Sequence, residues 1–283
     1  MSNLPVRVHS LHVHPMKSCA GVEVAEALLI ETGLELDRAW MLVDAQGDFL
    51  SQRELPRLAL VRPTLKTSEV VLRAPGMLAL HVAVDAVEKP LPGTLWGEAV
   101  GAYDMGALSA RWFSDFLGRE VRLLRFDPEQ RRSVDLPSQG GAGAEAAFQD
   151  TSALLVTSTA SLDEVNRRLR AAAEAPVTMA RFRPNIVLDG LAPHGEDALD
   201  VVSFATPEGP VRLKLVQPCE RCPIIDVDPL TAERGHAVGD ALAGYRADPR
   251  RGGAITFGMH AVVLEGIDRV LRAGLAGTAT LRP

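Results

Sequence analysis

The chain has 283 residues, of which 47% are hydrophobic and 23% are charged, so it can bury a large core and does not have the composition of a disordered protein. Its formal net charge of −6 argues against broad binding to nucleic acid or to anionic membranes, which requires a basic surface. There is no run of 18 apolar residues, and the first residues lack the layout of a secretory signal. We therefore expect a cytoplasmic protein of one or two domains, with neither nucleic acid nor a membrane as its partner.

The first hundred residues favour short strands separated by turns. Apolar and polar residues alternate over residues 6–13 with one slip in register, which is typical of a strand that contains a bulge. Residues 40–43 and 49–51 flank a glycine-containing turn and predict a β-hairpin. Such short, closely spaced strands indicate a barrel or a sandwich.

The pattern changes near the middle of the chain. Apolar residues share one side of a helix over residues 108–117, and Gly118 follows as a helix-ending glycine. Residues 121–126 predict a strand, and the Gly- and Ala-rich residues 138–150 predict a mobile loop. We place a domain junction near residue 120, which divides the chain into residues 1–120 and 121–283.

The second half favours strands with a few helices. Ser161 and Glu164 have the spacing of a capping box and predict a helix over residues 162–174. Most segments beyond it, including residues 224–228, have the composition of strands. The expected fold class is therefore mainly β with α: an N-terminal β-barrel-like domain, and a second β-barrel or strongly bent sheet with peripheral helices.

One cysteine pair is the main chemical signal, because phosphate-binding glycine loops, zincin motifs and nucleophile elbows are all missing from the sequence. Cys219 and Cys222 are separated by two residues, one of which is Arg221, and a proline flanks the pair on each side. The pair could be a zinc knuckle, a thioredoxin-type redox pair or two buried structural side chains. The adjacent cation favours a fourth possibility, a functional thiolate of the kind that soft or high-valent metals bind.

Several motifs together resemble a known family. The stretches DTSALLVTSTASLDEVNRRL, RFRPNIVLDG, HGEDALDVVSF and PCERCPIIDVDP are similar to the MOSC domain, named from the C-termini of molybdenum cofactor sulfurases. The stretch HPMKSCAGVEVAEALLIETGLELDRAW and the residues after it resemble the β-barrel that precedes this domain in the mitochondrial amidoxime-reducing component and its bacterial relatives. The likeness covers most of the chain, in the family's order.

The resemblance implies a site for the molybdenum cofactor, a molybdopterin that carries molybdenum, and no requirement for pyridoxal phosphate. It makes Cys222 the catalytic residue and the thiolate ligand of the metal. The contacts that it implies for the pterin and its phosphate are Lys17, Ser18, Arg38, Asp150, Thr151, Ser152, Arg183, Asn185 and Arg221. These residue types suit that role, because cations bind phosphate and the polar side chains match the edge of a pterin.

Two residues depart from the family pattern. Glu220 stands where the amidoxime-reducing relatives have serine, and His260 stands where they have tyrosine. No cysteine follows Cys222, so the four-cysteine ferredoxin-like domain of some bacterial relatives is not part of this sequence. We therefore expect electrons to come from a separate partner, of the ferredoxin or flavoprotein reductase type.

The expected function is the reduction of small N-hydroxylated compounds, such as amidoximes and hydroxylamine-type base analogues, to amines. An alternative is a carrier that presents the molybdenum cofactor, or sulfur as a persulfide on Cys222, to another enzyme. A third is a binding module whose cysteines are structural. The sequence does not assign a proton donor. Its candidates are Asp226, Asp228 and His260, and a polar loop with His194, Glu196 and Asp197 could either border the pocket or face water.

Overall fold

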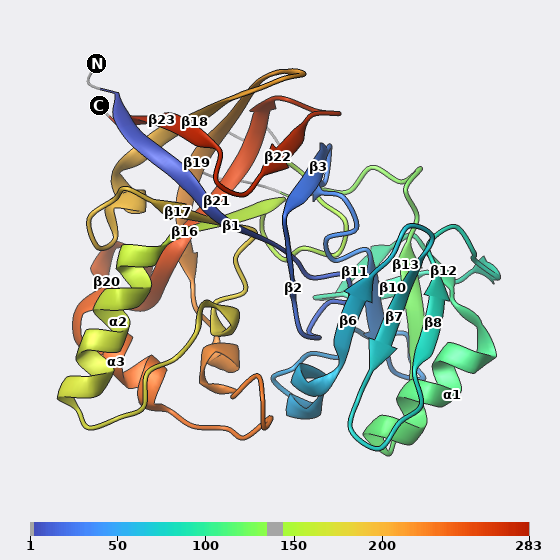
Figure 1. Ribbon diagram of the computed structural model, residues 1–283. Helices are drawn as coiled ribbons and strands as arrows, with labels where there is room; N and C mark the ends of the chain where they lie inside the picture. Colours follow the sequence, from blue (N-terminus) through green and yellow to red (C-terminus); the bar gives the residue numbers. More distant parts are fainter. Residues whose placement is uncertain (1–2, 135–143, 283) are drawn as a thin grey trace.

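The structure, a computed structural model, describes residues 3–134 and 144–282. Seven strands close into a barrel in the order β16, β17, β1, β23, β18, β19 and β21, with β21 pairing back to β16 (Figure 1). Their bounds are β1 (Leu4–Val13), β16 (Leu154–Ser158), β17 (Ile186–Asp189), β18 (Leu199–Thr206), β19 (Gly209–Glu220), β21 (Ala254–Glu265) and β23 (Ala276–Leu281). The expectation of a β-barrel with peripheral helices is confirmed.

The barrel begins with the first strand of the chain. Val6 and Val8 face the core on one side of a register shift, and Leu11 and Val13 face it on the other. The predicted bulge is therefore confirmed. Since β1 pairs with β17 and β23, the start of the chain is built into the sheet of the second half. The barrel sheet therefore contains strands from both sides of residue 120, and the domain junction there stays a prediction from the sequence.

The inside of the barrel is a packed core. Val8, Leu11, Leu188, Leu213 and Met259 are each 1% exposed or less and belong to one apolar cluster. Because each residue in a strand alternates with one on the opposite face, this cluster fills the interior while polar residues face outward. Any site must therefore lie at the barrel's end or side, not along its axis.

The residues between β1 and β16 form smaller sheets beside the barrel (Figure 1). The larger sheets contain β5 (Trp40–Val43), β13 (Arg122–Phe126), β12 (Ala102–Asp104) and β9 (Lys89–Pro90), and β6 (Arg62–Leu65), β7 (Glu69–Arg73) and β8 (Leu80–Ala83). The short strands in this region are β3 (Glu26–Ile30), β4 (Gly33–Leu34), β10 (Gly93–Leu95), β11 (Glu98–Val100), β14 (Ser133–Val134) and β15 (Ala144–Glu145). β2 (Val22–Val24) pairs instead with β1, β20 (Ala247–Asp248) pairs with β21, and β22 (Val270–Arg272), from the end of the chain, pairs with β3. A second apolar cluster, around Trp40 and Phe113, holds this part together.

The predicted hairpin is present in part. β5 turns at Asp44, whose backbone N–H bonds to Asp48 O, and Leu50 N then donates to Leu42 O. The returning arm makes only a single bridge, between Val43 and Phe49, and on the same edge of β5 Trp40 makes a bridge to Met16. The neighbour of β5 in the sheet is β13.

The helix α1 (Gly106–Leu117) confirms the helix predicted in the middle of the chain. It ends at Gly118, whose φ of 71° is the left-handed conformation that glycine adopts most readily. Trp112, Phe113 and Phe116 lie on its buried face, against the sheet of β6, β7 and β8. The prediction for Leu108, which the same period placed on this side, is wrong: Leu108 lies in the first turn and is 74% exposed.

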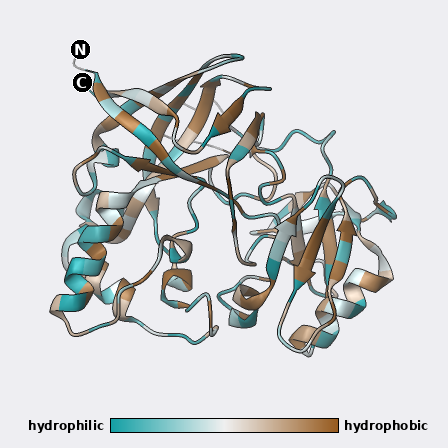
Figure 2. Cartoon of the chain, in the orientation of Figure 1, coloured by the Kyte–Doolittle hydropathy of each residue, from teal (hydrophilic) through white to brown (hydrophobic). Residues whose placement is uncertain are grey.

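The capping box was wrong. The helix α2 (Thr159–Ala171) begins three residues earlier, because Ser158 is its N-cap and accepts from Ser161 N at 3.2 Å. Glu164 instead forms ion pairs with Arg167 and Arg168 on an exposed face (Figure 2 shows this helix mostly hydrophilic). Serine at both positions made the two starts equally plausible from sequence.

Two further expectations need correction. The segment predicted as a strand after Cys222 is a short 3-10 helix, η5 (Pro223–Asp226), because the proline sets the first turn. The mobile loop falls partly on residues 135–143, outside the described residues. Its described end has no helix or strand after β15, but it is buried rather than exposed: Ala146, Phe148 and Gln149 are 4% exposed or less.

Most of the other helices pack beside the barrel, whereas η1 packs in the cluster around Trp40 and Phe113. They are α3 (Ala237–Arg246), η1 (Pro56–Leu60), η3 (Met179–Arg181), η4 (Gly195–Ala198) and η6 (Pro249–Arg251). Phe182 and Phe257 stack at 3.9 Å between ring centroids in a cluster that joins α2, α3 and η5. Among the described residues, no helix has the length and apolar character that crossing a membrane requires.

Candidate functional site

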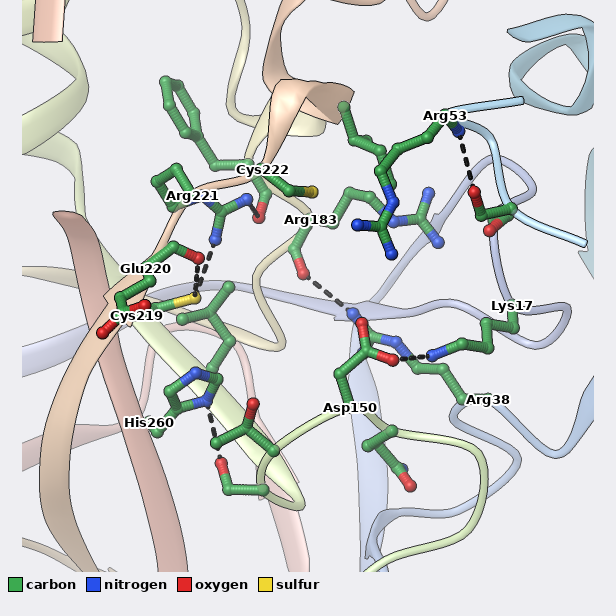
Figure 3. Close-up of a pocket in the computed structure, with 18 of the residues that line it drawn as sticks. Lys17, Arg38, Arg53, Asp150, Arg183, Cys219, Glu220, Arg221, Cys222 and His260 are labelled. Carbon is green, nitrogen blue, oxygen red and sulfur yellow. Dashed lines mark hydrogen bonds and ion pairs between the residues drawn. The ribbon is translucent and has the colours of Figure 1, made fainter. Parts of the chain in front are cut away.

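One cavity gathers all ten predicted site residues. It holds about 870 Å³ of space, counted out to its open mouth, and both the barrel and the neighbouring sheets contribute to its walls (Figure 3). The predicted residues in its lining are Lys17, Ser18, Arg38, Asp150, Thr151, Ser152, Arg183, Asn185, Arg221 and Cys222. Their sequence separation exceeds 200 residues, so only the fold could bring them together. Their individual roles stay predictions.

We call Lys17, Arg38, Arg183 and Arg221 the inner cations. Lys17 follows β1 and is 6% exposed. Its Nζ donates to Phe148 O at 2.7 Å and forms an ion pair with Asp150. Burial lowers the pKa of Lys17 below its ordinary value, and the nearby carboxylate only partly offsets that effect.

Arg38 is held by acceptors on three sides. Its guanidinium donates to Asp37 Oδ2 at 2.5 Å, to Asn185 Oδ1 at 3.2 Å and to Arg183 O at 3.0 Å. The side chain of Asp37 is fully buried, so this ion pair is shielded from water. Asn185 Oδ1 also accepts from Leu155 N at 3.1 Å, which means that its amide already links β16 to the segment before β17.

Arg183 donates to the backbone carbonyl of Cys19. Burial, together with the positive charge of Arg38, lowers its pKa to about 10. A guanidinium with this pKa is still charged at pH 7, but a negative ligand beside it would be stabilising. The inner cations therefore form a region of positive charge that protein carboxylates do not fully neutralise.

Two buried cysteines show opposite behaviour. Cys19 is fully buried, and burial raises its pKa to about 12 although Arg183 opposes the shift. Burial also disfavours the thiolate of Cys219, but the charges of His260 and Arg221 outweigh it and lower its pKa to about 6. Arg221 Nη1 lies 3.0 Å from Cys219 Sγ. The structure thus favours a thiolate at Cys219, which the sequence analysis did not predict.

Cys222 lies three residues further on, at the start of η5, and is partly exposed. In Figure 3 its side chain projects toward Arg53 and Arg183, whereas the sulfur of Cys219 lies on the side of Arg221 and His260. Cys222 is therefore the cysteine of the pair that presents its sulfur to the open cavity.

His260 lines the cavity and is the one proton-donor candidate placed there. Its Nδ1 lies 3.0 Å from Ser152 Oγ, which also donates to Leu154 O at 3.0 Å. Glu220, the other departure from the family pattern, is exposed and pairs with Arg251 at 2.9 Å.

The remaining candidates lie outside the lining. Asp226 caps α3 by accepting from the backbone N–H groups of residues 238 and 239, and Asp228 pairs with Arg181 and forms a turn. In the polar loop, Glu196 is fully buried and accepts from Ser161, so this residue neither borders the cavity nor faces water. The other two loop residues are His194, bonded to Tyr245, and Asp197, paired with Arg246.

Left-handed backbone conformations are concentrated at the cavity. Nine described residues other than glycine have a positive φ, and four of them line the cavity: Ser18, Arg38, Trp96 and Arg183. Such conformations cost about 1–3 kcal/mol each and persist only where surrounding contacts fix them. Strain of this kind is a feature of binding sites.

Sequence reasoning missed three residues at the cavity mouth. We call Arg53, Trp96 and Phe49 the rim. Arg53 lies over the ring of Trp96 at 4.4 Å from its centroid, and Phe49 packs edge-on against the same ring at 5.3 Å. Trp96 Nε1 donates to Asp150 Oδ1 at 2.7 Å. Arg53 and Trp96 are in turns, where the sequence carries no periodic signal, and Phe49 lies in the predicted hairpin arm, whose pattern gave no sign of a site.

The zinc alternative finds no support in the described part of the chain. Within residues 3–134 and 144–282, no group of three or more His, Cys, Asp or Glu side chains is arranged to hold a metal ion. The site is better described as a cavity lined by buried cations with one accessible cysteine, at the side of a β-barrel.

Comparisons with known proteins agree with that description. The model of the MOSC N-terminal beta barrel domain matches residues 5–120, and the model of the MOSC domain matches residues 143–275. Mitochondrial amidoxime reducing component 2 from Rattus norvegicus is 34% identical over 79% of this chain and 67% of its own length. Mitochondrial amidoxime-reducing component 1 from Homo sapiens is 33% identical over the same shares.

A third relative is much longer. Molybdenum cofactor sulfurase from Homo sapiens is 29% identical over 90% of this chain but only 30% of its own length. The chain spans about two thirds of the length of the amidoxime-reducing relatives. It belongs to the family of MOSC-domain proteins that carry the MOSC N-terminal domain and include the amidoxime-reducing components.

Proposed function

We propose that this protein is a molybdenum-cofactor-dependent oxidoreductase that reduces N-hydroxylated compounds to amines. One observation carries the proposal: the fold places the accessible sulfur of Cys222 in the same cavity as the four inner cations. The names of the relatives, amidoxime-reducing components, supply the reaction class.

The residues of the cavity fit this cofactor. A dithiolene and a phosphate are anionic, and the inner cations provide the charge that would balance them. Arg221 also provides an unpaired hydrogen-bond donor, because its Nε is buried and has no hydrogen-bond partner among the described residues. A buried donor without a partner costs about 1–3 kcal/mol, and an anionic ligand beside it would remove that cost. Cys222 would be the protein's ligand to the metal.

The reaction breaks the N–O bond of the substrate. Two electrons and two protons enter: one proton forms a new N–H bond, the other joins the departing hydroxyl to give water, and R–NH–OH becomes R–NH₂. When bound, the cofactor supplies the two-electron oxygen-transfer chemistry. The protein's part is to fix Cys222 between Arg221 and Pro223, to hold the inner cations in place and to bind the N–OH compound at the cavity mouth.

The test is expression in a host that makes the cofactor. We expect near-stoichiometric molybdenum and pterin, and reduction of benzamidoxime with reduced methyl viologen as the electron source. Cys222→Ser should lose at least about 100-fold in rate, the loss typical of removing an essential catalytic group. Cys19→Ser is the matched control, because Cys19 is buried away from the lining. Full turnover by Cys222→Ser would refute the ligand assignment.

A carrier function is the second candidate. The similarity to molybdenum cofactor sulfurase and the thiolate favoured at Cys219 both support sulfur chemistry in this cavity. A carrier predicts cyanide-releasable sulfur and no reduction of benzamidoxime, whereas the enzyme predicts molybdenum and turnover.

The electron donor would be a separate iron–sulfur or flavin protein. We also propose that the protein acts in the cytoplasm. Reconstitution with a reduced ferredoxin and with a flavoprotein reductase distinguishes the two donor classes. Fractionation of cells that express the native chain tests the location, and recovery in the membrane fraction would contradict it.

A further inference from the structure

Trp96 stands where the backbone would favour a different residue. It lies at the tip of a two-residue hairpin between β10 and β11, in which Leu95 pairs with Glu98. Trp96 and Gly97 have φ values of 55° and 85°, the pair of positive angles that a type I′ turn requires. Asn-Gly is the sequence that best fits such a turn, and a bulky ring in the left-handed region is costly. The requirements of the turn therefore do not explain the tryptophan.

The side chain is instead fixed over the cavity. Its Nε1 bonds to Asp150, Phe49 packs against it edge-on, and Arg53 stacks on the ring. Even so, Trp96 is 49% exposed while it lines the cavity. A large aromatic surface is thus left in contact with solvent at the mouth of the site.

Arg53 differs from the inner cations. Each inner cation donates to a protein acceptor, whereas the guanidinium of Arg53 makes no hydrogen bond or ion pair to any of the described residues. In Figure 3 it points into the cavity near Arg183, on the side that Cys222 faces. A flat guanidinium and a flat indole together form a surface suited to stacking on a planar conjugated ring.

We infer that Arg53 and Trp96 bind the substrate and select N-hydroxylated compounds in which the carbon or nitrogen of the N–OH-bearing group is bonded to a planar conjugated ring, as the amidoxime carbon of benzamidoxime is. The inference rests on the proposed function and names the substrate class of the same site. The rim is assigned to substrate rather than to the pterin because Trp96 is 49% exposed at the open side, whereas the predicted cofactor contacts Lys17 and Asn185 are 6% and 1% exposed at the inner side. The other two rim residues are partly exposed, and Asp150, which Trp96 contacts, lies between the two sets.

The test compares two substrates on the holoenzyme: benzamidoxime, which is planar and aromatic, and acetamidoxime, which is small and aliphatic. Trp96→Asn removes the ring and gives the turn its preferred sequence, so the variant should fold. We expect its KM for benzamidoxime to rise about tenfold, which corresponds to a typical base-stacking energy, with kcat changed less than about twofold. The KM for acetamidoxime should change less than about twofold.

Two further variants control the comparison. Trp96→Phe keeps a ring and should restore most of the preference for benzamidoxime. Leu78→Asn makes a similar change from a large apolar side chain at another exposed position, 89% accessible, and should leave both KM values unchanged. Equal effects of Trp96→Asn on both substrates would overturn the inference, and so would a loss of pterin from that variant.

A binding measurement separates this inference from the proposed function. Trp40 and Trp112 are 0% and 7% exposed, so acrylamide quenches mainly the fluorescence of Trp96. Benzamidine, the product of benzamidoxime, should protect that fluorescence in the holoprotein, and acetamidine should not. If the wild type reduces neither oxime, the proposed function fails. Protection by benzamidine would then still support the rim as a binding surface for planar rings, and lack of protection would overturn it.

Discussion

The inner cations and the rim border the same cavity but are organised in opposite ways. Lys17, Arg38 and their neighbours are held by carboxylates, of which Asp37 is buried, and by backbone carbonyls before any ligand arrives. Arg53 rests only on Trp96, at the open mouth. A preorganised set of charges suits a ligand that stays bound, because no reorganisation is needed on binding. A stacking surface without fixed polar partners suits ligands that exchange.

The largest change in the free energy of unfolding is expected when an inner cation is replaced. Arg38→Met leaves the carboxylate of Asp37 buried without its cation, and breaking a buried pair in this way costs about 3–5 kcal/mol. Urea unfolding should show this loss, and the cofactor content should fall with it. Arg111→Ala, which breaks an exposed pair with Asp115, should cost less than about 0.5 kcal/mol. Equal losses in the two variants would remove the distinction between inner and exposed cations.

The pH dependence of stability tests the thiolate of Cys219. Its pKa of about 6 in the folded protein is below the ordinary value of 9.0, so the unfolded chain binds the proton more tightly. Its contribution, up to about 4 kcal/mol, is complete above pH 9 and is lost as the pH falls toward 6. In the apoprotein, the difference in the free energy of unfolding between wild type and Cys219→Ser should therefore grow from pH 6 to pH 9. Parallel curves would contradict the ion pair with Arg221.

Lys17→Met should have a smaller effect than the loss of Arg38. It leaves Phe148 O without its donor, but Asp150 is 57% exposed and can be solvated. We expect a cost of about 1–2 kcal/mol in urea unfolding. Pterin retention, measured by fluorescence after oxidation, should nevertheless fall, since a cation is lost. Unchanged retention would remove Lys17 from the cofactor contacts.

The smallest change in the free energy of unfolding is expected at the rim, where the substitution should stabilise the protein. Trp96→Asn should raise the free energy of unfolding by about 0.5–1 kcal/mol, because the turn gains a residue suited to a positive φ. Thermal unfolding of the apoprotein measures the gain. A loss of stability would show that the ring contributes more to folding than to ligand binding.

Sequence patterns with a clear period were reliable guides. The alternation in β1, the bulge within it and the buried face of α1 apart from Leu108 were predicted, because each depends on neighbouring residues alone. Predictions failed where two local signals conflicted. Two serines could each cap α2, and Pro223 starts a 3-10 helix in an apolar stretch that otherwise has the composition of a strand. The motifs of the family also sufficed to predict which ten residues share one cavity.

By itself, the sequence determined the fold class, the family and the set of residues that meet. Only the tertiary structure decided how their charges are distributed: that Cys219 is the buried sulfur beside Arg221, that Cys222 faces the opening, and that Arg53 stacks on Trp96. The reason is physical. Periodicity and motifs are properties of the chain, whereas burial and charge pairing depend on distances between residues that are far apart in sequence.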